Sequence, residues 1–151
     1  RLVPAHHKRN IRRILGELVE HANATDRAGV SLARDPWIRR QLASLATDVQ
    51  AVRLLFYRIA WMIRDGLPTP YETALAKVMA DETGQAVAAL GMDMLGLYGP
   101  LTQGSRWAKL NGSIQHLYQT SLGQTIAGGT SEILRSTVAT RGLALPSEPR
   151  A

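Results

Sequence analysis

Apolar residues recur along most of the chain three and four positions apart, which is the period of an amphipathic α-helix. Four segments carry such a stripe, beginning near residues 11, 36, 72 and 107, and a shorter one follows residue 131. No segment alternates apolar and polar residues for long enough to predict a strand, so we expect essentially no sheet. Because the connections are short, the pattern predicts an all-α, up-and-down antiparallel bundle of four to five helices.

Capping residues indicate where these helices begin and end. Asp35 directly precedes a proline, which is typical of a helix start, and Gly66 should stop that second helix after roughly thirty residues. Thr69 and Glu72 have the spacing of a capping box at the start of the third helix, which Gly96 should end.

The later helices are shorter. A fourth is predicted from Trp107 and a fifth from Ser131 to about Arg141, with a tail marked by two prolines. The large apolar side chains on the stripes are predicted to lie in the core, among them Phe56, Met79, Met94 and Trp107.

Composition narrows the class of protein. The chain has 151 residues, 45% hydrophobic and 20% charged, which predicts one globular domain over residues 1–151. It has no cysteine and therefore no disulfide framework. We find no run long enough to span a membrane and no signal-peptide pattern, and we expect a cytoplasmic location.

The formal net charge is +6, with a basic cluster near the N-terminus at Lys8, Arg9, Arg12 and Arg13. Such a cluster favours either a solvated helix face or the binding of nucleic acid or a phosphate-bearing ligand. His6, His7 and His21 have no carboxylate or cysteine at ligand spacing, so we predict no metal site.

The stretch with most chemical information is residues 127–135, Ala-Gly-Gly-Thr-Ser-Glu-Ile-Leu-Arg. Gly128 and Gly129 let the backbone pass close to a ligand, because no Cβ stands in the way. Thr130 is a good N-cap, and Glu132 falls in the first helical turn, where the helix dipole favours a negative charge. The stretch therefore indicates either an ordinary helix cap or a seat for an anion or the polar edge of a ring.

The same stretch resembles the C-terminal signature of the acyl-CoA dehydrogenase family, in which a Gly-Thr-Ser-Gln/Glu-Ile segment opens the last helix beside the flavin. The resemblance extends to the order of the helices, to Leu-Gly-Leu-Tyr-Gly at residues 95–99 and to Arg-Gly-Leu-Ala-Leu-Pro at residues 141–146. It is strongest for the actinobacterial branch that handles steroid or other bulky acyl-CoA esters. It implies that Gly129, Thr130, Ser131 and Glu132 line FAD, and that Gly128 and Gly129 lie near the acyl thioester.

The chain departs from the family pattern at several positions. Many relatives carry the catalytic glutamate where Gly128 stands, so no catalytic residue is visible, and the resemblance implies that a base would lie just upstream of Arg1. Thr25 replaces an arginine that reaches the flavin pyrophosphate in relatives, and Arg27 or Arg135 is the predicted substitute. Asp93 replaces a glutamine that contacts FAD, and it is predicted to accept from ribose or adenine.

Three functions follow as alternatives. The first is the C-terminal domain of an FAD-dependent dehydrogenase of acyl-CoA, with electron-transfer flavoprotein or a similar acceptor as partner, in a homo- or hetero-oligomer (dimer or tetramer). That enzyme also needs an N-terminal helical domain and a β-domain, so we expect the fragment alone to be inactive. The second is a non-catalytic, degenerate subunit or scaffold of a heteromeric acyl-CoA dehydrogenase. The third is a basic nucleic-acid-binding module, which rests on charge alone, so we expect no nucleic acid among the partners.

Overall fold

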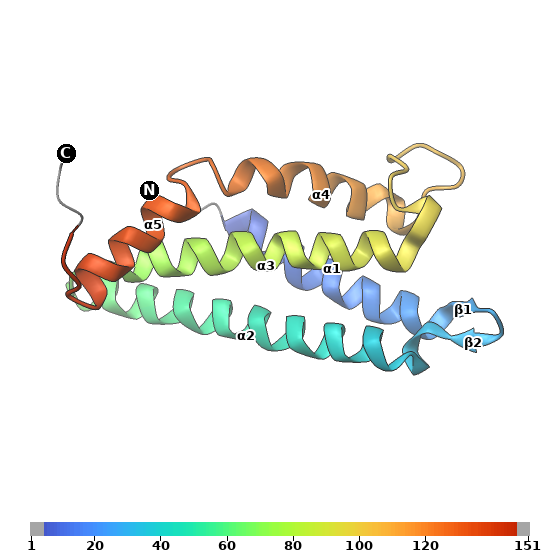
Figure 1. The fold of residues 1–151 in the computed structure, drawn as a ribbon, viewed down its shortest axis with the longest axis horizontal. Coiled ribbons are helices and arrows are strands. Elements are labelled where there is room, and N and C mark those ends of the chain that lie inside the picture. Colours follow the sequence, from blue (N-terminus) through green and yellow to red (C-terminus); the bar gives the residue numbers. More distant parts are fainter. Residues whose placement is uncertain (1–4, 148–151) are drawn as a thin grey trace.

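The computed structural model describes residues 5–147, and of residues 5–10 it describes the backbone only. The five helices are α1 (Ala5–Ala24), α2 (Pro36–Arg64), α3 (Glu72–Leu95), α4 (Ser113–Gln124) and α5 (Ser131–Thr137). Consecutive helices from α1 to α4 run in opposite directions along a common axis (Figure 1). The predicted all-α antiparallel bundle is therefore confirmed.

Some predictions fall outside the described part of the chain. These are the position upstream of Arg1, the side chains of His6, His7, Lys8 and Arg9, and the tail at Pro149.

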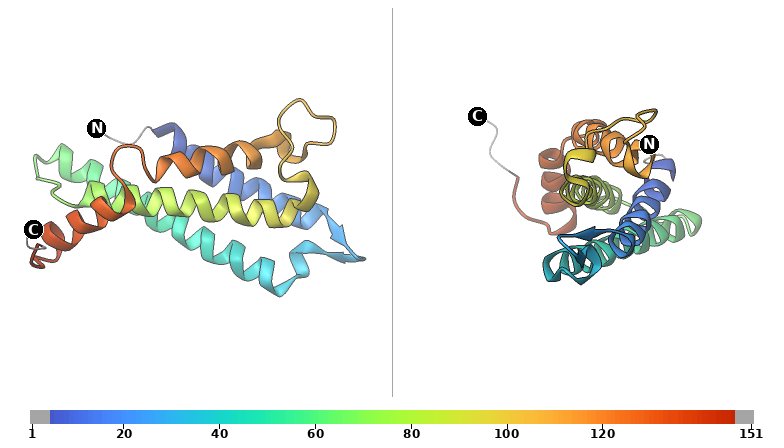
Figure 2. Two further views of the ribbon diagram at one scale, coloured as in Figure 1. Left: turned by 45° about the horizontal axis from the view of Figure 1, so that its top comes forward. Right: turned by 90° about the vertical axis from the view of Figure 1, so that its right-hand side faces the viewer.

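Helix α3 is the central helix of the bundle. It contacts α1, α2, α4 and α5, and the end-on view places it among them (Figure 2). Its sequence suits this position because small residues such as Ala76, Ala80, Gly84 and Ala88 are buried and let neighbouring helices approach closely. A helix that is buried on most of its faces shows little amphipathic pattern.

The apolar core lies between α1, α2, α3 and α4. Its most deeply buried large side chains are Ile14, Leu18, Leu32, Ile38, Val87, Ile114 and Leu117. Of the predicted core residues, Met94 is buried, and Phe56 and Met79 are half-buried. Trp107 was wrongly predicted to be core: its side chain is 57% exposed, because it lies in the loop before α4 and not on a helix.

The ends of α2 agree with the prediction. Oδ1 of Asp35 accepts hydrogen bonds from the backbone N–H of Trp37 at 2.8 Å and of Ile38 at 3.2 Å, which caps the helix. After the helix Gly66 adopts a φ of +69°, a left-handed conformation that suits glycine.

The start of α3 differs from the predicted capping box. The N-cap is Tyr71 and not Thr69, because Tyr71 has a φ of −136°, outside the helical region. The predicted box does not form: no side chain caps the helix start, and the Glu72 carboxylate accepts from the backbone N–H of the adjacent Tyr71 at 3.4 Å.

The start of α4 lies six residues later than predicted. Leu110, Asn111 and Gly112 adopt φ values of +49°, +52° and +69°, so three successive left-handed residues separate the Trp107 region from the helix. The short 3₁₀ turns η2 (Gly96–Tyr98) and η3 (Lys109–Gly112) flank this long loop.

The one sheet in residues 5–147 is a small antiparallel hairpin of β1 (Asp26–Arg27) and β2 (Val30–Ser31), followed by the 3₁₀ turn η1 (Leu32–Arg34). Ala28 and Gly29 turn the chain with φ values of +52° and +80°. Strands of two residues are too short to produce an alternating pattern, so the sequence did not predict them. At the C-terminal end, the π turn η4 (Val138–Gly142) continues α5 to the predicted end near Arg141.

Candidate functional site

The glycine turn, residues 128–130, lies between α4 and α5 at the end of the bundle opposite the β-hairpin (Figure 1). Gly128 and Gly129 have φ values of +72° and +113°, where a side chain would be strained. Thr130 is the N-cap of α5, as predicted, and its Oγ1 accepts from the Ile133 backbone N–H at 3.4 Å. The turn therefore presents bare backbone beside a capped helix start.

Glu132 and Arg135 extend from the first turns of α5. The pKa of Glu132, which is fully exposed, lies below its ordinary value. It is lowered by a hydrogen bond from the backbone N–H of Glu132, by one from the Thr130 hydroxyl and by the charge of Arg135. Arg135 Nη2 forms an ion pair with Glu82 Oε1 of α3 at 2.6 Å. Arg135 is thus held by α3, and Glu132 is anionic at neutral pH.

A surface cavity of about 340 Å³ lies beside the turn. Its wall includes Phe56 of α2, Thr73 and Lys77 of α3, Gly128, and Leu134 of α5. A Cβ at Gly128 would stand 3.5 Å from Lys77 Cε, which is an ordinary contact distance. The left-handed backbone conformation therefore favours glycine at position 128, and a steric clash of the added Cβ does not.

Arg27 and Asp93 lie together at the hairpin end of the bundle. Arg27 Nη2 donates to the backbone carbonyl oxygens of Asp93 at 3.3 Å and of Met94 at 3.1 Å, at the C-terminal end of α3. The Arg27 side chain therefore caps α3, where the helix dipole favours a cation.

The predicted cofactor residues consequently form two separate groups in one chain. Lys77, beside Gly128, precedes Asp93 by sixteen positions on α3, which is about 24 Å at 1.5 Å per residue. The structure brings residues 128–132 together and brings Arg27 to Asp93, but it does not bring the two groups to each other.

Sequence reasoning missed a buried ion pair next to the turn. Lys77 Nζ lies 2.5 Å from Asp81 Oδ2, with the two side chains 11% and 2% exposed. The spacing of four residues on a helix was the available signal.

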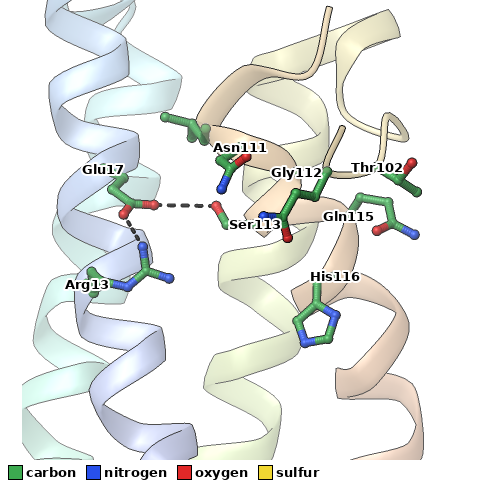
Figure 3. A pocket seen from close by; sticks show the side chains of 10 residues that line it. Arg13, Glu17, Thr102, Asn111, Gly112, Ser113, Gln115 and His116 are labelled. Atoms are coloured by element: carbon green, nitrogen blue, oxygen red, sulfur yellow. Dashed lines mark hydrogen bonds and ion pairs between the residues drawn. The ribbon is translucent and has the colours of Figure 1, made fainter. Parts of the chain in front are cut away.

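A larger cavity of about 750 Å³ lies between α1 and the start of α4 (Figure 3). On one side, Glu17 accepts from Arg13 and from Ser113 Oγ, the latter at 3.3 Å. His116 and Gln115 of α4 complete this polar wall. None of the predicted site residues lines the cavity, and the described residues hold no cluster of metal-ligating side chains.

The sequence model of the acyl-CoA dehydrogenase C-terminal domain matches residues 5–143. The chain belongs to the acyl-CoA dehydrogenase family. Acyl-CoA dehydrogenase IpdE1 of Mycobacterium tuberculosis is 31% identical over 141 residues, which are 91% of this chain and 33% of that protein.

Solved structures of acyl-CoA dehydrogenases share the fold. The ChsE4–ChsE5 complex from Mycobacterium tuberculosis matches with a TM-score of 0.84 and 28% identity, covering 93% of this chain and 37% of that one. The Tcur3481–Tcur3483 steroid ACAD matches with a TM-score of 0.82 and 28% identity, covering 91% and 35%. The predicted resemblance to the actinobacterial steroid branch of the family is thereby confirmed. The chain spans about one third of the length of these relatives.

Proposed function

We propose that the chain is the C-terminal helical domain of an FAD-dependent acyl-CoA dehydrogenase that desaturates an acyl-CoA thioester between its α and β carbons. The observation that carries this proposal is the glycine turn, whose two left-handed glycines leave room for a ligand against the backbone beside the capped start of α5. A steroid side chain or a fatty acyl group is the proposed substrate, and the similarity to the steroid ACAD supports the first of these.

The residues at the turn fit a flavin. Gly128 and Gly129 carry no Cβ, so a planar ring can approach their peptide groups. The Thr130 hydroxyl accepts from the Ile133 backbone N–H and donates to Glu132, so Thr130 and Glu132 are held together at the start of α5. Gly129, Thr130, Ser131 and Glu132 would hold FAD, with Gly128 and Gly129 near the thioester. When bound, FAD supplies the acceptor for the hydride that leaves the β carbon.

Gly128 has no group that can take a proton, so the α-proton requires a base from elsewhere. We propose a carboxylate immediately upstream of Arg1, on the approach to α1. Because Gly128 has no side chain, the acyl carbon and that carboxylate would meet in the space beside it.

Arg27 and Asp93 are too far from the turn to join it around one flavin in the same chain. We propose that they face the cofactor of a neighbouring subunit in a homo- or hetero-oligomer, dimer or tetramer. The similarity to the ChsE4–ChsE5 complex supports such an assembly. Electron-transfer flavoprotein or a similar carrier is the proposed electron acceptor, the cytoplasm the proposed location, and this domain alone is proposed to be inactive. In the described residues, no helix is both long and apolar enough to cross a membrane.

The test uses the complete protein. We expect a flavin absorbance band and reduction of an artificial electron acceptor when an acyl-CoA is added. Changing the upstream carboxylate to glutamine should lower turnover by about 10²–10⁴, the usual range for a general base. Unchanged turnover would reject the relocated base, and a protein without flavin would instead be a non-catalytic subunit of the same fold.

A further inference from the structure

The loop that carries the glycine turn is held by one face of α3. Lys77, Asp81 and Gln85 are spaced four residues apart, so their side chains lie in a row along the helix. We call these three residues the α3 row. Each connection of the row ends on α4 or on the loop after it, and none of them ends on the core.

Lys77 makes the first connection. Its Nζ donates to the backbone carbonyl oxygen of Gln124, the last residue of α4, at 2.9 Å, and to Asp81 Oδ2 at 2.5 Å. A lysine at this position satisfies a helix-end carbonyl and places positive charge at the negative end of the α4 dipole. Asp81 fixes the direction in which the ammonium group points.

Gln85 makes the second connection. Its Nε2 donates to the Ser121 carbonyl oxygen at 3.3 Å and to Thr125 Oγ1 at 3.4 Å. The Thr125 carbonyl oxygen accepts in turn from the Ser131 backbone N–H at 3.2 Å, which closes the loop onto the first residue of α5. Both ends of the glycine turn are therefore tied, through Gln124 and Thr125, to the same face of α3.

The ion pair between Lys77 and Asp81 has a high cost in lost hydration. Lys77 and Asp81 are nearly buried, and Asp81 Oδ1 has no hydrogen-bond partner. Buried ion pairs seldom stabilise a fold more than apolar residues of similar size, because both charges lose their hydration. A contribution to fold stability therefore does not account for the ion pair, whereas the directed hydrogen bond from Lys77 to the Gln124 carbonyl oxygen does.

We propose that Lys77 and Asp81 are positioning residues for the glycine turn, which set the place of its backbone against flavin and thioester. The expected effect of the pair on the cofactor rests on the proposed function. The expected effect on the position of the loop does not. The pair acts through the Gln124 carbonyl, and neither side chain needs to touch the ligand.

The experiment compares two buried charge sites on α3 in the complete protein. The double variant Lys77→Met with Asp81→Leu removes both charges together, so that no buried charge is left unpaired. The matched control is Glu72→Gln, because Glu72 is also nearly buried and pairs with Arg58 of α2 at 3.7 Å and not with a residue of the loop. The readouts are thermal unfolding, amide hydrogen exchange of residues 125–130, flavin affinity, and kcat and KM for an acyl-CoA.

We expect the double variant to exchange the amides of residues 125–130 about tenfold faster and to bind flavin about tenfold more weakly, as loss of one charge-assisted hydrogen bond predicts. Its unfolding temperature should stay close to that of the control. Wild-type exchange and wild-type flavin affinity in the double variant would overturn the inference. A purely structural pair would instead lower the unfolding temperature and leave flavin affinity and KM of the folded protein unchanged.

Two further variants cover the remaining outcomes. If the double variant does not fold, Lys77→Arg keeps the charge and moves the donor, and Gln85→Met removes the second connection. Unchanged exchange and flavin affinity in both would also overturn the inference. If the unaltered protein binds no flavin, the proposed function fails, and the exchange rates of residues 125–130 still decide whether the pair positions the turn.

Discussion

Gly91 of α3 and Ile114 of α4 occupy adjoining space with no room for another atom. A Cβ placed on Gly91 would stand 2.6 Å from Ile114 Cδ1 and 2.9 Å from Cγ2, and Ile114 is fully buried. The distance between the two helices is thus set by the absence of a side chain at Gly91.

Gly91→Ala should therefore destabilise the fold by about 1–3 kcal/mol, the usual range for an overpacked core. Gly16→Ala on α1 is the matched control, because no atom lies within 4 Å of its added Cβ. Alanine is favoured over glycine inside a helix, so the control should gain roughly 1 kcal/mol. The changes in the free energy of unfolding, measured in denaturant, should have opposite signs in the two variants. A loss of similar size in both would contradict the packing account.

Gly112 closes the loop before α4 against the backbone of residues 102 and 103. An added Cβ would lie 2.4 Å from the Gln103 backbone nitrogen, and the φ of +69° adds strain. Gly104 also has a positive φ, +94°, but open space around it. We expect Gly104→Ala to cost about 1 kcal/mol, the strain of a left-handed conformation, and Gly112→Ala to cost clearly more, as measured by thermal unfolding. Equal losses of stability in the two variants would mean that the loop moves to accommodate the Cβ at residue 112 without an energetic cost.

His21 gives the fold a dependence on pH. Partial burial and the nearby charge of Lys109 lower the pKa of His21. Below its ordinary pKa of about 6.5 the unfolded chain takes up the proton before the folded one, so this contribution to stability is present above that pH and is lost as the pH falls towards the folded pKa. In His21→Gln, the difference in unfolding temperature between pH 7.5 and pH 5.5 should be smaller than in the unaltered protein. An equal or larger difference would assign the acid sensitivity to other groups.

Gly128→Glu would place a carboxylate at the position where the resemblance to the family implies a base. Because the φ of Gly128 is +72°, the substitution should cost about 1 kcal/mol in strain, and the new side chain would start over the Lys77 stem, 3.5 Å from its Cε. We therefore expect little recovery of turnover in a variant of the complete protein that lacks the proposed upstream carboxylate. Recovery to within about tenfold of the unaltered enzyme would show that the turn can still present a base.

The sequence was sufficient for the parts of the fold that local chemistry decides. Asp35 and Gly66 marked the ends of α2, and Thr130 marked the start of α5, because each satisfies or stops the backbone on its own. The start of α4 could not be predicted, since nothing local signals the left-handed conformation of Leu110, whose side chain packs against the core, while Asn111 is exposed. Trp107 was misplaced for the same reason.

The candidate site was predictable to a similar degree. Residues 128–132 form a motif along the chain, so one sequence shows them. Lys77 and Gln124 are forty-seven positions apart and meet only after α3 and α4 pack. The separation of Arg27 and Asp93 from the turn likewise depends on the length of α3 in the folded bundle.

The central position of α3 has a consequence for how the chain opens. Helices α1, α2, α4 and α5 all contact α3, and α1 and α2 also contact each other, so most of the core is lost once α3 leaves. Amide protons in the middle of α3, around Val87 and Ala88, should then exchange with solvent only when the whole bundle unfolds, whereas those of the hairpin should exchange through local fraying. The slowest-exchanging amides of the protein would accordingly report its global stability.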